Sequence, residues 1–287
     1  MNVLVATDGS EYGRWELNWV ATLPFVESPR VTVLHVVDIS ALRAPFLPQP
    51  VVAGSGGYIH EEIERMEVRA AQIITDTKKQ LAALKLKGTV QKEQGTVAPV
   101  ILKHAPKRDG LLVVGSKGLD ALDRFMLGSV STNLISHATC PVLVVKNEAA
   151  PLRRITLATD GSVASAQALE FVLTKFQPDY STGKGRRVPI QVSVIHVEPL
   201  SWNPKLMGVG RRSVERSVQK LIEAGFTAES VYRLGKPAKA IMTVASKQEA
   251  DLIVTGTKGL SAIARVLLGS VSTRVVQHAT CSVLVVR

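Results

Sequence analysis

The phrase "GSKGLDALDRFMLGSVS" at residues 115–131 returns as "GTKGLSAIARVLLGSVS" at residues 256–272. In each copy the first glycine ends a short apolar run, and the last glycine precedes a serine-rich segment. Each copy is then followed by "HATC" and a second valine-rich run. This pattern indicates a buried strand that leads through a glycine-framed loop into a helix, twice in one chain.

The repeat extends over nearly the whole chain. "NVLVATDGS" (2–10) matches "RITLATDGS" (154–162), and further matching blocks follow in the same order. Insertions fall between the blocks, as expected when loops vary while strands and helices persist. The charged segment "KNEAAPLRR" (146–154) joins the two copies. The sequence therefore predicts two domains, at residues 1–147 and 151–287.

Short β-branched runs alternate with longer stretches of helical periodicity within each copy. In the first copy we expect strands at 2–7, 31–37, 89–94, 111–115 and 141–145. We expect helices at 11–22, 61–86, 97–108 and 129–138. Such alternation implies right-handed crossovers and a parallel sheet that is covered on both faces. The predicted fold class is α/β, with two tandem, doubly wound, five-stranded, Rossmann-like domains related by a pseudo-twofold axis.

The composition of the 287 residues is that of a globular protein, with 46% hydrophobic and 21% charged residues. The formal net charge of +11 raises the expectation of a polyanionic partner. The basic residues are scattered over separate predicted elements, as on solvated helix faces, so nucleic acid is not favoured. We find no basic leader in "MNVLVATDGS" and no apolar run of about 20 residues that could span a membrane. We expect a cytoplasmic protein with no membrane association.

The candidate site lies where the predicted strands end, because open α/β sheets bind ligands at their carboxyl edge. Gly128 and Gly269 each precede a predicted helix, whose free N–H groups and dipole form an anion site. Ser129 and Ser131 add hydroxyl groups within reach of a phosphate. The sequence thus predicts a phosphate chain held mainly by main-chain amides.

The glycine spacing resembles the ATP-binding branch of the universal stress protein family. That motif is Gly, two residues, Gly, nine residues, then Gly-Ser or Gly-Thr, and both copies meet it alongside "ATDGS" and "HATC". The resemblance covers nearly the whole chain. It implies a stress-response sensor or regulator that binds ATP, with or without Mg²⁺, in one or both domains.

Nucleotide-binding residues follow from the resemblance position by position. Asp8 and Asp160 are implied to contact the nucleoside, while the main chain at the end of the second strand meets adenine. In the first copy the implied residues are Asp8, Val36, Gly115, Lys117, Gly118, Gly128, Ser129, Val130 and Ser131. In the second copy they are Asp160, Val197, Gly256, Lys258, Gly259, Gly269, Ser270, Val271 and Ser272. We expect bulky residues at Gly115 and Gly256 to abolish binding and leave the fold intact.

The resemblance also bears on assembly. Members of the family commonly dimerise through their last strands, which implies a homo-oligomer. Here the runs at 141–145 and 282–286 can instead pair within one chain and cover two hydrophobic edges. One departure from the family pattern is Val97, which stands where the second copy has Pro237. Because proline at a helix start is favourable but dispensable, this difference weakens the first copy only slightly. The sequence identifies no protein partner.

Several plainer interpretations stay open. Asp8 and Asp160 could simply cap the following helices, since aspartate is a preferred N-cap residue. The glycines of the repeated phrase could serve only as turn residues. Lys117 and Lys258 could face water instead of phosphate.

Two H-x-x-C pairs suggest a tetrahedral zinc site: His137 with Cys140, and His278 with Cys281. Each pair, however, spans a helix end and the start of a buried strand. We therefore expect both cysteines to pack as small hydrophobic residues. Two thiols at matching points of the repeat also fit a reducing compartment better than a disulfide scaffold.

The sequence offers no recognisable catalytic apparatus. It contains neither the P-loop motif nor the nucleophile elbow of hydrolases, and no paired carboxylates at a catalytic spacing. Weak ATP hydrolysis, or self-phosphorylation of Ser129 or Ser270, is possible but lacks a visible base. We therefore expect a binding protein and not an enzyme. The alternative is an interaction module with vestigial nucleotide pockets and a basic surface for an acidic partner.

The segment at 40–60 leaves the second predicted strand at the ligand end. Its prolines and glycines are expected to exclude a regular element. It could fold over the nucleotide as a lid, or it could be a plain loop. Its counterpart at 199–210 is shorter and carries Trp202.

Overall fold

The computed structural model describes residues 1–39, 55–107, 109–116, 127–181, 187–198, 209–257 and 268–287. The first half of the chain contains β1 (Asn2–Ala6), α1 (Glu11–Thr22), β2 (Arg30–Val37), α3 (Ser55–Ala83), β3 (Gly88–Gln94), α4 (Val97–His104), β4 (Leu111–Gly115), α5 (Ser129–His137) and β5 (Val142–Val145). The second half contains β6 (Arg154–Ala158), α6 (Val163–Lys175), β7 (Asp179–Ser181), β8 (Arg187–Pro189), β9 (Gln191–Glu198), α7 (Val209–Glu223), β10 (Thr227–Leu234), α8 (Pro237–Lys247), β11 (Leu252–Gly256), α9 (Ser270–His278) and β12 (Ser282–Val286).

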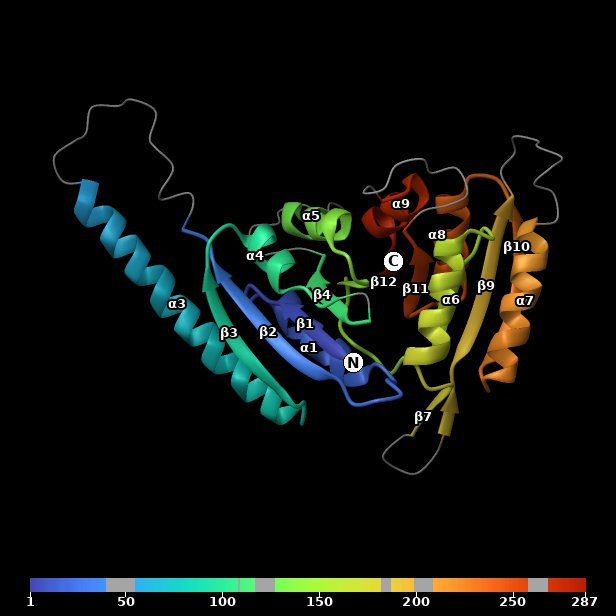
Figure 1. Ribbon diagram of the computed structural model, residues 1–287, viewed down its shortest axis with the longest axis horizontal. Coiled ribbons are helices and arrows are strands. Elements are labelled where there is room, and N and C mark those ends of the chain that lie inside the picture. The colour runs from blue at the N-terminus through green and yellow to red at the C-terminus, as the bar shows by residue number, and fades with distance from the viewer. Residues whose placement is uncertain (40–54, 108, 117–126, 182–186, 199–208, 258–267) are drawn as a thin grey trace.

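The predicted α/β fold is confirmed. Each half forms a five-stranded parallel sheet, and the two sheets join into one sheet of ten strands (Figure 1). The strand order is β10-β9-β6-β11-β12-β5-β4-β1-β2-β3. The chain moves outward from β1 through β2 to β3 and then returns to the other side of β1 as β4. The strand order therefore reverses between β1 and β4, and likewise between β6 and β11, which is where doubly wound sheets bind ligands.

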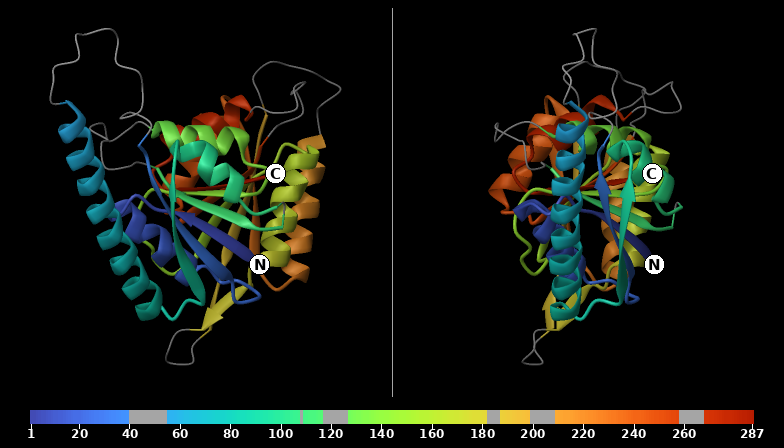
Figure 2. Two further views of the ribbon diagram at one scale, coloured as in Figure 1. Left: turned by 60° about the vertical axis from the view of Figure 1, so that its left-hand side comes forward. Right: turned by 90° about the vertical axis from the view of Figure 1, so that its left-hand side faces the viewer.

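Helices cover both faces of the sheet with separate hydrophobic cores. On one face α1, α3, α6 and α7 pack against the sheet, with Trp19, Leu81 and Phe171 among the buried side chains. On the other face α4, α5, α8 and α9 do so, with Ile101 and Ile241 among the buried side chains. α3 and α7 lie at opposite ends of the molecule, and α5 and α9 lie side by side near its centre (Figures 1 and 2).

Three details differ from the sequence prediction. The helix expected at 97–108 ends at His104, because Ala105 precedes Pro106 and a residue before proline is disfavoured in a helix. Residues 55–60, expected to lack regular structure, form the first part of α3. The last proline before them is Pro50, and glycines in a helix lower its stability without breaking it. The hairpin of β7 and β8 was not predicted.

The two halves join through their last strands. β5 and β12 are antiparallel, with Leu143 opposite Leu284, as predicted from the two valine-rich runs. The basic residue after each of these strands then crosses to the other half. Lys146 Nζ donates to the carbonyl of Ala279 at 2.7 Å, just beyond α9, and Arg287 donates to the carbonyl of Ile135 in α5. Each half thereby satisfies carbonyl groups at a helix C-terminus of the other.

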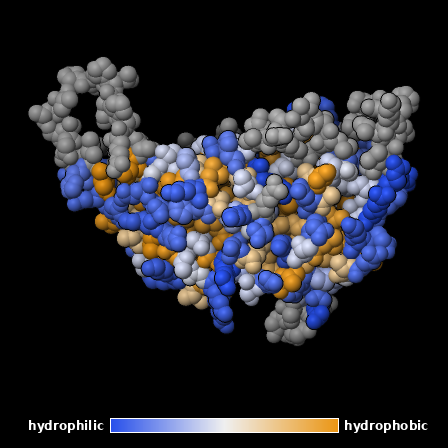
Figure 3. Space-filling view, in the orientation of Figure 1, coloured by the Kyte–Doolittle hydropathy of each residue, from blue (hydrophilic) through white to orange (hydrophobic). Residues whose placement is uncertain are grey.

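The edges and surface of the molecule are polar. The two outermost strands, β3 ("GTVQKEQ") and β10 ("TAESVYRL"), carry charged side chains, which discourage pairing with another chain. Hydrophilic side chains alternate with small hydrophobic patches over the face seen in Figure 3. Within the described ranges, no helix combines the length and apolar character needed to cross a bilayer.

Candidate functional site

The loop after the first strand of each half is built around an aspartate. Asp8 Oδ1 accepts the N–H of Ser10 at 2.9 Å, and Ser10 in turn caps α1 by accepting the N–H of Gly13 at 3.3 Å. Asp160 and Ser162 repeat the first contact at 3.0 Å. The helix caps are therefore the serines, and the interpretation of the aspartates as N-caps is wrong. Each aspartate shapes the loop that lies at the reversal of strand order.

The glycine in each of these loops is required by the backbone. Gly9 has a φ of 77° and Gly161 a φ of 82°, in the left-handed region that favours glycine. A Cβ atom at Gly9 would also lie 2.5 Å from the side chain of Ile73 in α3. The "DGS" sequence therefore fixes a tight turn that brings the aspartate to the edge of the sheet.

The main chain of Val36 faces the space beyond the end of β1. The carbonyl of Leu34 accepts the N–H of Thr7 at 3.0 Å, so the polar groups of Leu34 point toward β1. Main-chain groups two residues apart on a strand point the same way, and β1 ends at Ala6. The N–H and C=O of Val36 consequently point over the end of β1, at the reversal of strand order.

Val197 occupies the matching place in the second half. The carbonyl of Ile195 accepts the N–H of Thr159 at 2.9 Å, which directs the main chain of Val197 over the end of β6. A histidine precedes each valine, and His196 Nδ1 lies 3.0 Å from the carbonyl of Thr159. His35 Nδ1 makes the same contact at 2.9 Å. Because a carbonyl only accepts, both rings carry a hydrogen on Nδ1. We did not predict these histidine contacts.

The N-terminus of α5 lies beside this edge. Its N-cap is Gly128, and no described side chain caps its first turn, so the leading N–H groups have no side-chain partner there. Gly128 itself donates to the carbonyl of Ser116 at 2.9 Å, which closes the base of the glycine loop. Ser129 is exposed at the first helical position, whereas the buried Ser131 donates its hydroxyl to the carbonyl of Gly115 at 2.6 Å. Ser131 thus joins α5 to β4 instead of offering that proton to a ligand.

α9 repeats this arrangement in the second half. Gly269 is the N-cap and donates to the carbonyl of Thr257 at 2.7 Å. Ser270 is exposed, and Ser272 donates to the carbonyl of Gly256 at 2.7 Å. Val130 and Val271 are partly buried and pack against the core of this face. The structure therefore brings together the described parts of both predicted sites.

Four predicted binding residues lie outside the described part of the chain: Lys117, Gly118, Lys258 and Gly259. The same holds for residues 40–54 of the predicted lid and for Trp202 in its counterpart.

Gly256 has a packing role as well as a place in the motif. A Cβ atom there would lie 2.5 Å from both the carbonyl carbon and the carbonyl oxygen of Ala164 in α6. Because the obstacle is main chain, it cannot move aside cheaply. The prediction that a bulky residue at Gly256 leaves the fold intact is therefore wrong.

A buried carboxyl group, which we did not predict from the sequence, lies under the first site. Glu16 in α1 is only 3% exposed, and it forms a hydrogen bond with the main chain of Gly115. Burial, and then the negative charge of Asp8, hold the pKa of Glu16 well above its usual range, while the bond from Gly115 acts in the opposite direction. Its Oε2 atom has no hydrogen-bond partner among the described atoms. The equivalent residue of the second half is Ala168.

The cysteines pack as predicted. Cys140 is fully buried and Cys281 is 8% exposed, both in the core under α5 and α9. Burial raises the pKa of each thiol to about 11, so both are held as neutral thiols at physiological pH. His137, by contrast, lies exposed on α5 and contacts the carbonyl of Asn133 at 2.9 Å. Within the described ranges, no group of three or more His, Cys, Asp or Glu residues is placed to hold a metal ion.

Comparison with known proteins identifies the family of this architecture. The chain matches the Universal stress protein family twice, over residues 1–146 and 151–287. A universal stress protein of Mycolicibacterium smegmatis is 29% identical over 99% of this chain and 96% of its own length. One from Mycobacterium tuberculosis is 27% identical with the same coverage. The crystal structure of a universal stress protein from Archaeoglobus fulgidus covers 100% of this chain and 98% of its own, with a TM-score of 0.71 and 21% identity, which shows a shared fold.

Proposed function

The chain belongs to the universal stress protein family, and we propose that it binds ATP at the carboxyl edge of the sheet in one or both halves. The observation that carries this proposal is the pair of helices α5 and α9. Each begins at a glycine, without a side-chain cap from the described residues, next to the reversal of strand order. Free N–H groups and a helix dipole at such a point favour a phosphate group.

The remaining contacts follow from the position of each group. The main chains of Val36 and Val197 offer one donor and one acceptor over the ends of β1 and β6, which suits the edge of an adenine ring. Asp8 and Asp160 carry carboxylate oxygens that suit ribose hydroxyls. The glycine loops would surround the phosphates, with Lys117 and Lys258 as candidate partners.

Mg²⁺ is compatible with this arrangement. The ion prefers oxygen ligands and commonly binds through substrate phosphates together with few protein groups. The exposed hydroxyls of Ser129 and Ser270 stand at the phosphate end of each site. When bound, the ion would neutralise phosphate charge and so strengthen the binding of the triphosphate.

We assign the protein a regulatory role in the stress response of its family, and not a catalytic one. The bound nucleotide would select the conformation or the partner of the protein, and no described residue is assigned as a general base. Cys140 and Cys281, both unpaired and buried, suit the reducing cytoplasm. We leave the protein partner unassigned.

The test is calorimetric titration of the full chain with ATP, ADP and cyclic AMP. Ser129→Asp and Ser270→Asp place a negative charge where the phosphates would bind. The same change should preserve folding, because acidic residues are favourable in the first turn of a helix. We expect each variant to weaken ATP binding at its own half at least tenfold, and the double variant to remove it.

Asn133→Asp is the matched control for the first half. It adds the same charge to the same helix one turn further on, and it should leave ATP affinity within about twofold. If none of the three nucleotides binds the wild-type chain, the proposal is wrong and the pockets are vestigial. If the double variant bound ATP as tightly as the wild type, the phosphates would not lie at the N-termini of α5 and α9.

A further inference from the structure

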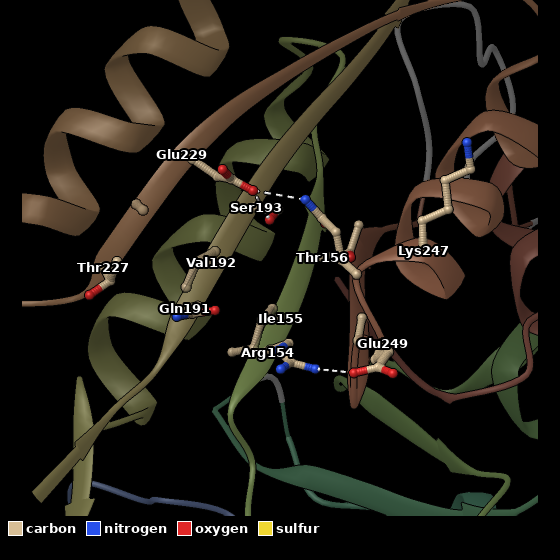
Figure 4. Close-up of a pocket in the computed structure, with 13 residues that line it drawn as sticks. Arg154, Ile155, Thr156, Gln191, Val192, Ser193, Thr227, Glu229, Lys247 and Glu249 are labelled. Atoms are coloured by element: carbon tan, nitrogen blue, oxygen red, sulfur yellow. Dashed lines mark hydrogen bonds and ion pairs between the residues drawn. The ribbon is translucent and has the colours of Figure 1, made fainter.

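A second hollow lies at the opposite edge of the sheet. It has a volume of about 440 Å³ and is bounded by the first residues of β6, β9 and β10 and by the C-terminal end of α8. Figure 4 shows Arg154, at the start of β6, pointing toward Glu249, just beyond the end of α8. The candidate nucleotide site uses the carboxyl ends of the strands, so this hollow is a separate feature.

A row of three polar side chains forms its floor. Thr156, Ser193 and Glu229 are directly paired on adjacent strands, so all three side chains point to the same face of the sheet. Ser193 Oγ donates to Glu229 Oε1 at 2.8 Å. Thr156 is fully buried, yet its hydroxyl has no hydrogen-bond partner among the described atoms. The floor thus contains a polar group that the described chain does not satisfy.

A second unsatisfied oxygen comes from the turn after α8. Gln248 Nε2 donates to Glu229 Oε1 at 2.8 Å. A carboxylate accepts but cannot donate, so the nitrogen of the amide must face Glu229. Gln248 Oε1 is then left buried, with no partner in the described part of the chain. Because buried polar atoms are normally hydrogen-bonded, two such oxygens in one hollow point to a missing polar partner, and Gln248 Oε1 needs one that donates.

Four charged side chains line the hollow: Glu229, Glu249, Arg154 and Lys247. Glu229 carries a negative charge, and the C-terminus of α8 adds the negative end of the helix dipole. The nearby positive charges are directed elsewhere. Arg154 is paired with Glu249 at 2.7 Å, and the side chain of Lys247 extends away from the strands (Figure 4). A ligand with several N–H donors and a positive charge would complement this set of acceptors.

The equivalent hollow of the first half lacks this floor. It has a volume of about 670 Å³, and its corresponding row is Leu4, Thr32 and Thr89. Pro106 follows the earlier end of α4, where the second half continues α8. The fold therefore does not require the polar floor, and the second half carries it as a feature of its own.

We propose that the hollow of the second half binds a small organic cation, a protonated amine or guanidinium, between Glu229, Gln248 and Thr156. The cation donates N–H groups to the exposed carboxylate of Glu229. Contact with Gln248 Oε1 and with the hydroxyl of Thr156, both closed to solvent in this structure, requires the side chain of Gln248 to move aside. This site does not depend on the proposed nucleotide site.

Calorimetric titration of the full chain with agmatine tests the proposal, because agmatine carries both an ammonium and a guanidinium group. We expect saturable binding of one agmatine per chain, and much weaker binding of the neutral polyol xylitol. Thr156→Leu installs the residue of the first half, and Glu229→Gln removes the charge. Each should weaken agmatine binding at least tenfold, without altering ATP binding.

Glu93→Gln is the matched control, since Glu93 lies on β3, the corresponding edge strand of the first half. It should leave agmatine affinity unchanged. If circular dichroism shows that Thr156→Leu disturbs folding, the test rests on Glu229→Gln alone. Glu229 is exposed on the edge strand β10, so its replacement should leave the fold intact. Absence of saturation, or equal binding by wild type and Glu229→Gln, would overturn the proposal and leave water as the occupant. Xylitol binding as tightly as agmatine would exclude a cation site.

Discussion

The two halves of the molecule share a backbone plan and differ in what lies beneath their first loops. Both have the aspartate turn, the serine cap and the histidine contact to the loop carbonyl. Under the loop of the first half lie Gly13 and Glu16. The second half has Ser165 and Ala168 at these positions.

The difference shows that the same loop is supported in two chemical ways. In the second half Thr159 Oγ1 lies 3.1 Å from Ser165 Oγ and 3.0 Å from Ser213 Oγ, so neutral hydroxyls hold the loop. In the first half a buried carboxyl group fills the space and bonds to the main chain of Gly115. Among the described residues, a buried carboxyl group lies under the loop of the first half, with Ala168 in its place in the second, so the halves are expected to respond differently to pH.

Gly256→Val is expected to have the largest effect on stability, because the main chains of β11 and α6 lie too close together at Gly256 for a larger side chain. Its side chain would collide with the carbonyl of Ala164, and we expect the free energy of unfolding to fall by about 4 kcal/mol or more. Urea denaturation measures the loss. Leu234→Ala, at a residue that is 75% exposed, is the control and should change stability by less than about 0.5 kcal/mol. A wild-type midpoint for Gly256→Val would show that α6 can move away.

Ala168→Glu converts the second half to the first at one position. Ala168 is fully buried, and Ser165 occupies the side where the first half has only a glycine. The added carboxyl group would be crowded and cut off from water. We therefore expect the free energy of unfolding, measured by urea denaturation at neutral pH, to fall by about 3 kcal/mol. Ala168→Ser, a smaller polar change, should cost clearly less. If Ala168→Glu were neutral, the two halves would be interchangeable at this site.

Glu16→Gln tests the pH dependence of the first half. The pKa of Glu16 is raised in the folded state, so the folded chain retains a proton that the unfolded chain loses above about pH 4.5. From that pH up to the folded pKa, this group makes the free energy of unfolding fall as pH rises, by at most about 1.4 kcal/mol per pH unit. Glutamine cannot titrate, so the variant should lack this slope.

The measurement is urea denaturation of wild type and Glu16→Gln at a series of pH values. Glu11→Gln, at an exposed position of the same helix, should keep the wild-type slope. Parallel curves for wild type and Glu16→Gln would mean that Glu16 titrates normally.

The smallest expected effects concern a feature that the halves share. Ser10→Ala and Ser162→Ala each remove a helix N-cap, and each should cost about 1 kcal/mol in urea denaturation. Because the two caps lie in different halves, the double variant should lose the sum. If only one of the two variants lost stability, the two halves would also differ in how much their helix caps contribute.

The sequence was sufficient to predict the parts of the fold that depend on local pattern. Alternating strand and helix periods in both copies predicted the doubly wound halves, whereas the pairing of β5 with β12 was suggested by the family resemblance. The glycine-serine spacing predicted the exposed start of α5 and α9. Ser131 and Ser272 behaved differently from the prediction, because the third residue of each helix turns back toward the strand.

Other features that depend on contacts between distant segments were not predicted. Glu16 lies on the buried stripe of α1 between Gly13 and Trp19, and only comparison with Ala168 in the other copy could have singled it out. The polar floor of the second hollow depends on the register of three strands and on the length of α8. The hydrogen bonds that Lys146 and Arg287 donate to the opposite half could be seen only once the pairing of β5 with β12 was known.

The antiparallel pairing of β5 with β12 also has a consequence for the chain during its synthesis. β5 emerges from the ribosome well before β12, and at common rates of synthesis the interval is on the order of ten seconds. During that interval the hydrophobic edge of β5 has no partner from its own chain, and two nascent chains translated side by side could pair there. The strand that unites the finished molecule is thus an unpaired hydrophobic edge while the second half is being made.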